Sequence, residues 1–242
     1  MRGKFIGVFA ILAAAMLLSG ADVVRGDLIN DGAFAASPGQ IGYNTSVLGW
    51  TPLGTEGPLG SGHSPVFLFP PTGGTVTGDS FLGNVSFYGN PASSSDNDFV
   101  AVAGDPTYAG GIEQTINGLT AGQEYILTFN WAGAQQAGFS GDTTEKWQVR
   151  LGAQTQSTST VNTPSQSFLG WQTASMTFTA TAASELLTFD GVGSPTGLQP
   201  WLLLDNPKLN AVLPAAPLPS SVLMSTLGLG LIGLSKIRRR AN

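Results

Sequence analysis

Thiol and imidazole side chains, which serve as nucleophiles, general bases and soft metal ligands, are almost absent from this sequence. The chain of 242 residues has no cysteine and one histidine, His63, which lies in a segment rich in glycine, serine and proline. Composition therefore excludes thiol catalysis, disulfides and multi-histidine metal sites. There is no Gly-x-Ser-x-Gly motif, and a histidine without an orienting partner does not activate a serine. We predict that His63 is a solvated loop residue.

Carboxylates are numerous and bases are few. Between the two terminal segments the chain carries fourteen acidic and three basic side chains, a net charge of −11, against −5 for the whole chain. A surface of this sign repels a phosphate backbone, so we predict no nucleic-acid binding. At this density, acid pairs at glycosidase spacing arise by chance. The clustered pair Asp142 and Glu145, near Lys146, is predicted to be a solvated turn.

The elements that must position any site are predicted to be β-strands. Residues 123–131 alternate with period two, which places four large side chains on one face: Tyr125, Leu127, Phe129 and Trp131. A glycine-rich turn at 118–122 comes before this strand. Residues 111–116 form the strand on the other side of that turn, and we expect the two strands to pair as a hairpin.

Further strands are predicted at 66–69, 80–88, 98–103, 146–151, 172–180, 185–190 and 201–209. Residues 53–77 are otherwise predicted to be a long surface loop. The polar stretch 154–167 is predicted to be a hairpin tip or a mobile loop. Many short strands and no convincing helical pattern favour a sandwich of two sheets.

Both ends of the chain are apolar and basic. At the N-terminus, Arg2 and Lys4 precede an apolar run over 5–18 and small residues at 19–21, which is typical of a secretory signal peptide. An uncleaved anchor is the alternative.

The C-terminus combines a proline-bracketed segment, an apolar run and a basic end. The segment is Pro217, Leu218, Pro219 and Ser220, the run spans 222–234, and the end carries Lys236, Arg238, Arg239 and Arg240. This order predicts a membrane segment whose charges stay on the cytoplasmic side. The run is shorter than the roughly 20 residues of a full span.

The C-terminal arrangement closely resembles the PEP-CTERM sorting tail of exported bacterial proteins. The resemblance implies recognition and removal of the tail by an exosortase-type membrane protease. The family consensus has glutamate between the two prolines, where Leu218 stands here. We therefore predict a signal peptide at 1–26, one domain at 27–212 and a sorting tail at 213–242. The predicted location is the cell envelope, cell surface or extracellular matrix, after transient anchoring in the inner membrane.

Several motifs between 27 and 210 resemble, in order, those of galactose-binding-like jelly rolls, a fold shared with carbohydrate-binding modules. They are Leu28–Phe34, Gly49-Trp50, the stretch 112–129, the stretch 171–189 and Leu202–Asn206. The resemblance implies an all-β jelly-roll β-sandwich of two antiparallel sheets. Around it we expect an N-terminal signal helix and a short C-terminal transmembrane helix.

The resemblance also implies two kinds of ligand. Jelly rolls that bind glycans stack sugar rings on exposed aromatic side chains, and the candidates here are Tyr88, Tyr108, Trp131, Trp147 and Trp201. Core packing is the alternative, and it is the prediction for Trp50, Trp131 and Trp171.

Jelly rolls of this type often hold a structural calcium ion. Asp205 matches the acid of the closing strand, but Ala35 stands at the position of the first-strand glutamate, so Asp31 is the substitute candidate. The acidic loop at 96–98 is predicted to be a solvated turn.

These features predict an exported, non-catalytic protein, not an enzyme, of the extracellular matrix or associated with glycans. Its expected partners are the sorting protease, the membrane through its tail, and polysaccharide. A structural surface protein without a small ligand and a secreted glycan-active hydrolase are the alternatives.

Overall fold

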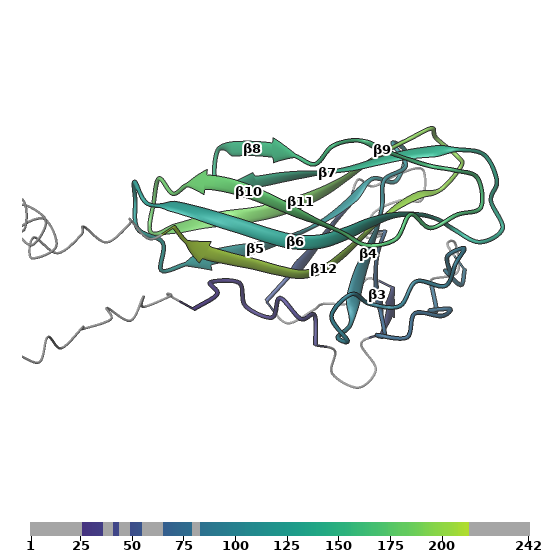
Figure 1. Ribbon diagram of the computed structural model, residues 1–242, viewed down its shortest axis with the longest axis horizontal. Coiled ribbons are helices and arrows are strands. Elements are labelled where there is room, and N and C mark those ends of the chain that lie inside the picture. Colours follow the sequence, from purple (N-terminus) through teal and green to yellow (C-terminus); the bar gives the residue numbers. More distant parts are fainter. Residues whose placement is uncertain (1–25, 36–40, 44–48, 55–64, 79–82, 213–242) are drawn as a thin grey trace, which may run out of the picture.

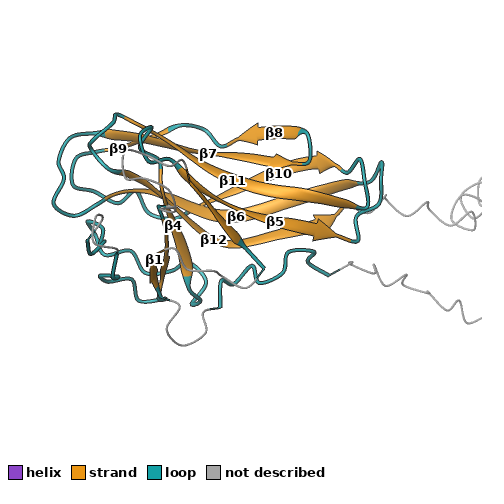
Figure 2. Cartoon of the chain, turned by 180° about the vertical axis from the view of Figure 1, so that it is seen from behind, coloured by secondary structure: helices purple, strands orange, loops and turns teal. Residues whose placement is uncertain are grey.

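The computed structural model describes residues 26–35, 41–43, 49–54, 65–78 and 83–212. Every helix or strand assigned among them is a β-strand (Figure 2). No helix within these ranges has the length and apolar character that crossing a bilayer requires. The predicted signal helix, the predicted transmembrane helix, the sorting residues 217–220 and 238–240, and His63 lie outside the described residues.

Within the described ranges, the strands form two antiparallel sheets, called sheet A and sheet B here (Figure 1). Sheet A has the order β1 (Gly42–Tyr43), β3 (Val66–Phe69), β4 (Phe99–Ala103), β12 (Pro200–Ala211), β6 (Glu124–Gln135), β10 (Gln172–Thr179). Sheet B has the order β2 (Thr51–Gly54), β5 (Gly110–Asn117), β11 (Ser184–Ser194), β7 (Thr143–Leu151), β8 (Gln154–Ser157), and β9 (Val161–Thr163) also pairs with β7. The two sheets form a jelly-roll β-sandwich, which confirms the predicted fold class.

The main core lies between the sheets and follows from the alternation of the strands. The inward side chains of β6, β7 and β10 are all buried: Tyr125, Leu127, Phe129, Trp131, Trp147, Val149, Leu151, Met176 and Phe178. The outward side chains of β10 are exposed. The predicted facing of these three strands is therefore confirmed.

A second apolar cluster lies on the opposite face of sheet A. Its members are Phe67, Phe69, Val76, Val85, Phe87, Phe99, Ala101, Ala103, Ala132, Ala134, Trp201 and Leu203. The alanines leave room for the aromatic rings. Val76, Val85 and Phe87 come from residues 70–78 and 83–98, which run beside β3 and β4 (Figure 1). Both faces of β6 are thus buried at this end, which ends its alternation after Trp131.

The predicted hairpin of 111–116 with 123–131 is wrong. The first strand, β5, belongs to sheet B and pairs with β2 and β11, whereas β6 belongs to sheet A. The glycine turn does form, with positive φ at Gly118 and Gly122, but it carries the chain from one sheet to the other. Leu119 is buried between the sheets, and the Tyr125 hydroxyl accepts a hydrogen bond from Thr120 N at 2.9 Å. Both strands alternate toward the same core, so the pattern could not tell which sheet each strand joins.

Two further predictions also need correction. The stretch 154–167 contains β8 and β9, both paired with β7. The expected strand at 80–88 is reduced, among its described residues, to isolated bridges from Val85 to Val76 and from Phe87 to Gln136.

Candidate functional site

A slot opens on one long side of the sandwich, where the edge of sheet A faces the edge of sheet B. The strands at these edges are β10 and β8. The slot has a volume of about 290 Å³, and its lining is Trp131, Gln156, Ser157, Thr158, Ser159, Gln172, Thr173, Ala174, Ser175 and Met176. None of these side chains is ionisable. Amides, hydroxyls and one indole therefore set its chemistry.

The first wall of the slot is the outer edge of β10. Side chains of β8 bond this edge at its far end: Gln156 Nε2 donates to the Thr177 carbonyl, and Gln154 Nε2 donates to the Thr179 carbonyl. Thr179 N donates in return to Gln154 Oε1 at 3.2 Å. We call these three hydrogen bonds the glutamine clasp. They occupy backbone groups that a neighbouring strand would otherwise bond.

Past the clasp, no strand of the described part of the chain pairs with this edge. In an antiparallel ladder, alternate residues direct their N–H and C=O groups away from the paired strand. The backbone groups of Thr177 and Thr179 point away from β6. Those of Thr173 and Ser175 therefore do so as well, and both residues line the slot. The wall thus presents backbone donors and acceptors in addition to side-chain hydroxyls.

The second wall is the end of β8 and the connection to β9, residues 156–159. Two hydrogen bonds hold it against β7, from Trp147 N to Thr158 Oγ1 and from Thr158 N to the Trp147 carbonyl, both at 3.0 Å. These bonds fix the position of residues 156–159 relative to β7 and the main core.

A buried carboxyl group lies on β7, two residues before Trp147. Glu145, on β7, is fully buried and accepts hydrogen bonds of 2.5 Å from the hydroxyls of Thr143 and Thr163. Gly133 leaves space for it, since a Cβ there would stand 2.9 Å from Glu145 Oε2. Burial raises the pKa of Glu145 from 4.5 to about 7, although the two threonine bonds lower it. Thr163 belongs to β9, so this group joins β9 to β7. The prediction of a solvated turn is wrong for Glu145.

The floor of the slot is Trp131. The hydrogen bonding of its indole N–H differs from that of the other four tryptophans. Those four N–H groups donate to protein acceptors: Trp50 to the Asp31 carbonyl, Trp147 to the Leu203 carbonyl, Trp171 to the Ala92 carbonyl and Trp201 to Gln136 Oε1. No acceptor among the described residues bonds the N–H of Trp131. Because Trp131 is 2% exposed, its ring packs in the core, as predicted, while its N–H remains available to a ligand in the slot.

Two of the predicted stacking residues have no exposed ring. Trp147 and Trp201 are 0% exposed. Trp147 packs edge-on against Phe189 in the main core, and Trp201 packs edge-on against Phe67 and Phe87 in the second cluster. The prediction that they offer a platform to sugar rings is therefore corrected. Trp147 lies between the two sheets. Trp201 is covered by side chains from residues 70–78 and 83–98, which the strand pattern did not reveal.

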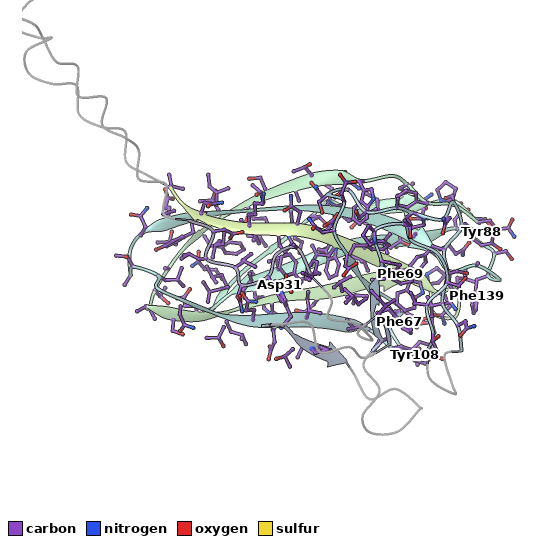
Figure 3. The ribbon with its side chains drawn as sticks, turned by 90° about the horizontal axis from the view of Figure 1, so that it is seen from below. Asp31, Phe67, Phe69, Tyr88, Tyr108 and Phe139 are labelled. Atoms are coloured by element: carbon purple, nitrogen blue, oxygen red, sulfur yellow. The ribbon has the colours of Figure 1, made fainter. Side chains whose placement is uncertain are left out.

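Tyr88 and Tyr108 are half-buried and lie toward one end of the sandwich, while Asp31 lies nearer its middle (Figure 3). The Tyr88 hydroxyl accepts a hydrogen bond from Gly138 N at 3.2 Å. Neither tyrosine lines the slot. A role for them in ligand binding stays a prediction.

The two acids of the predicted calcium site have different surroundings. Asp205 is fully buried, and its carboxylate accepts hydrogen bonds from Ser94 N, Ser94 Oγ and Ser95 Oγ at 2.6–2.8 Å. Burial raises the pKa of Asp31; the bond from Ala35 N lowers it, and the charge of Asp98 raises it further.

No described residue donates a hydrogen bond to Asp31 Oδ2. The described ranges hold no group of three or more acidic or histidine side chains placed to bind a metal ion. Asp31 and Asp205 alone do not supply the roughly six to eight oxygens of a calcium shell. The calcium site stays a prediction.

A second hollow, called the Glu113 hollow here, lies beside β5. It has a volume of about 320 Å³ and is lined by Asn30, Gly49, Thr51, Glu113, Gln114, Thr115, Asn117 and Leu186. Gln114 is already engaged, since its amide exchanges two hydrogen bonds of 2.7 and 2.8 Å with the backbone of Asn30. This hollow has a carboxylate and no aromatic ring.

Sequence reasoning missed Gln156, Gln172, Thr173 and Ser175 as site residues. Their one visible signal was polarity, since 154–167 is rich in serine, threonine and glutamine and β10 alternates threonine and serine outward. That signal is equally typical of a solvated loop and of a solvated sheet face.

Comparisons with known proteins give structural likeness only. No protein-family model and no curated protein matches the chain. Among solved structures, one similar chain is a CBM61 module in complex with β-1,4-galactotriose, at a TM-score of 0.43 and 15% identity, covering 76% of this chain and 97% of that one.

A CBM22 xylan-binding domain from Paenibacillus barcinonensis is similar at a TM-score of 0.37 and 15% identity, covering 75% of this chain and 100% of that one. The N-terminal cellulose-binding domain of a β-1,4-glucanase from Cellulomonas fimi is similar at 0.35 and 18%, covering 74% and 100%. At such TM-scores the likeness carries no argument about what this chain binds.

Proposed function

We propose that the domain is a non-catalytic module that binds neutral glycan in the slot between β10 and β8. The observation that carries this proposal is the available indole N–H of Trp131 at the floor of an uncharged pocket walled by amides and hydroxyls. Small-molecule sites combine an apolar floor with a few placed polar groups, and this slot has both.

The chemistry of the lining selects the ligand class. A sugar presents hydroxyls that donate and accept, and each group buried without a partner costs free energy. Glutamine amides, serine and threonine hydroxyls and the open backbone of β10 supply both kinds of partner. An anionic polymer finds no cation in this lining, and the domain around it is strongly acidic.

The same lining supports binding without catalysis. Glycoside hydrolysis takes a general acid and a second carboxylate, and no carboxyl or imidazole group lines the slot. Glu145 has a raised pKa, but it is fully buried and bonded to two threonines, out of reach of a ligand.

Titration calorimetry tests the binding role. The full-length protein, purified in a mild detergent, is titrated with neutral polysaccharides derived from cellulose, xylan, galactan and starch, with and without calcium. We expect saturable heat from at least one neutral glycan and none from an anionic polymer. Absence of heat across the panel contradicts the proposal and favours a structural surface protein.

We further propose that this domain is exported and sorted to the cell surface through its terminal segments. The basic and apolar N-terminus and the tail from Pro217 to Arg240 support this route. Mass spectrometry of the protein from a host that carries an exosortase-type protease tests it. We expect loss of both ends, and retention of the intact tail contradicts sorting by such a protease.

A further inference from the structure

We infer that the slot receives the end of a glycan chain and excludes an internal stretch. This inference rests on the proposed function of the slot and adds the part of the polymer that it recognises. It follows from two closures of the slot and from the chemistry of its lining.

The glutamine clasp closes the slot along the direction of the strands. Gln156 both lines the slot and bonds the Thr177 carbonyl across to β10, and Gln154 bonds Thr179 one step further on. The gap between the two sheet edges is therefore bridged by side chains beyond Met176. A polymer lying along β10 cannot continue past this point.

The main core closes the slot in depth. Trp131, Ala174 and Met176 form its inner lining, and Trp131 and Met176 are 2% and 5% exposed. The volume of about 290 Å³ lies at the lower end of ligand pockets, which run from about 300 to 1,000 Å³. A chain that points into the sandwich must therefore end within the slot.

The polar lining matches what a chain end has and an internal unit lacks. A terminal sugar carries a free hydroxyl where an internal unit carries the link to its neighbour. A pocket whose buried polar groups bond such a hydroxyl rejects a ligand that lacks it, because those groups then lose their partner. The Trp131 N–H is a group of this kind, since Trp131 is 2% exposed and no described residue accepts a hydrogen bond from its indole.

The test varies the number of chain ends at constant mass. A neutral polysaccharide that binds the full-length protein is partially hydrolysed to preparations of decreasing mean length, and the protein bound per unit mass is measured by depletion from solution. We expect doubling the number of ends to double the protein bound. Capacity that stays constant per unit mass overturns end recognition and leaves glycan binding intact. If no polysaccharide of the panel binds, glycan binding itself fails, and the inference fails with it.

Two clasp variants make the test independent of polymer preparation. Gln156→Ala opens the slot toward Thr177, so we expect its capacity to lose the dependence on ends and approach a constant per unit mass. Gln154→Ala is the matched control, since Gln154 belongs to the clasp but does not line the slot, and it keeps the wild-type dependence. Identical behaviour of the two folded variants contradicts the role of Gln156 as the closure.

Discussion

The slot and the Glu113 hollow lie on opposite sides of the sandwich and have similar volumes, about 290 and 320 Å³. They differ in lining. The slot has Trp131 at its floor and no charge, whereas the hollow has a carboxylate, an exposed Leu186 and an amide, Gln114, that is already bonded to the backbone. The larger hollow is thus the less suitable for a neutral sugar. Lining chemistry, more than size, separates a binding site from a surface irregularity.

The largest expected difference is in glycan affinity, when a tryptophan side chain is introduced to block one site or the other. Ser159→Trp places an indole in the slot from an exposed position, and Thr115→Trp does the same in the Glu113 hollow. We expect the first variant to lower glycan affinity by more than about a hundredfold and the second to leave it unchanged. Calorimetry of both variants, with circular dichroism to verify folding, measures this. Equal loss in both contradicts the assignment of the slot.

Glu145 and Glu113 are expected to differ by a few kcal/mol in what they contribute to the pH dependence of the free energy of unfolding. Since burial raises the pKa of Glu145 to about 7 from 4.5, the folded state holds a proton that the unfolded state has released between these values. Stability is therefore full below about pH 4.5 and falls as pH rises toward 7, by about 3 kcal/mol for a shift of this size. Glu145→Gln removes this fall, whereas Glu113→Gln keeps it. Urea unfolding from pH 4 to 8 measures the slopes, and a flat wild-type profile contradicts the raised pKa.

Tryptophan substitutions on the two sides are expected to separate stability from binding. Trp50→Phe loses the bond from its indole to the Asp31 carbonyl and should cost about 1–3 kcal/mol of stability without changing affinity. Trp131→Phe loses an N–H that no described residue accepts and should lower affinity about two- to tenfold. Denaturation and calorimetry on both variants test this. If Trp131→Phe binds as the wild type does, the indole N–H is not a ligand contact.

The smallest expected effect is that of salt. An uncharged slot predicts that glycan affinity stays constant as ionic strength rises, since screening acts only on charged groups. Calorimetry at low and high salt measures this, and a marked loss of affinity with salt contradicts binding between an uncharged ligand and uncharged groups.

The side chains on the inner faces of the sandwich could be predicted from the sequence, because a strand with one buried face alternates apolar and polar residues. Tyr125 to Trp131 and the β10 alternation are examples. The second apolar cluster could not be predicted, because Trp201 and Ala132 share it with Val76, Val85 and Phe87, which are distant in the sequence. Strand order depends on contacts between residues that are distant in the sequence. For this reason the pattern also did not show that β5 and β6 belong to different sheets.

The slot was beyond the reach of sequence reasoning for the same cause. Its floor, Trp131, its walls around Gln156 and Gln172, and the outward backbone of Ser175 meet only because β10 and β8 are the edge strands of their sheets. The pattern correctly placed Trp131 in the core, yet core placement alone does not reveal that no described residue accepts a hydrogen bond from its N–H. That property depends on which acceptors the fold brings near.

The most direct test of the account follows the five indole N–H groups of the protein by proton–nitrogen correlation spectroscopy during titration with a bound oligosaccharide. Four of these groups donate to protein acceptors. We predict that the resonance of Trp131 shifts with saturation while those of Trp50, Trp147 and Trp201 stay in place. Saturable binding that leaves the Trp131 resonance unmoved contradicts the slot as the glycan site.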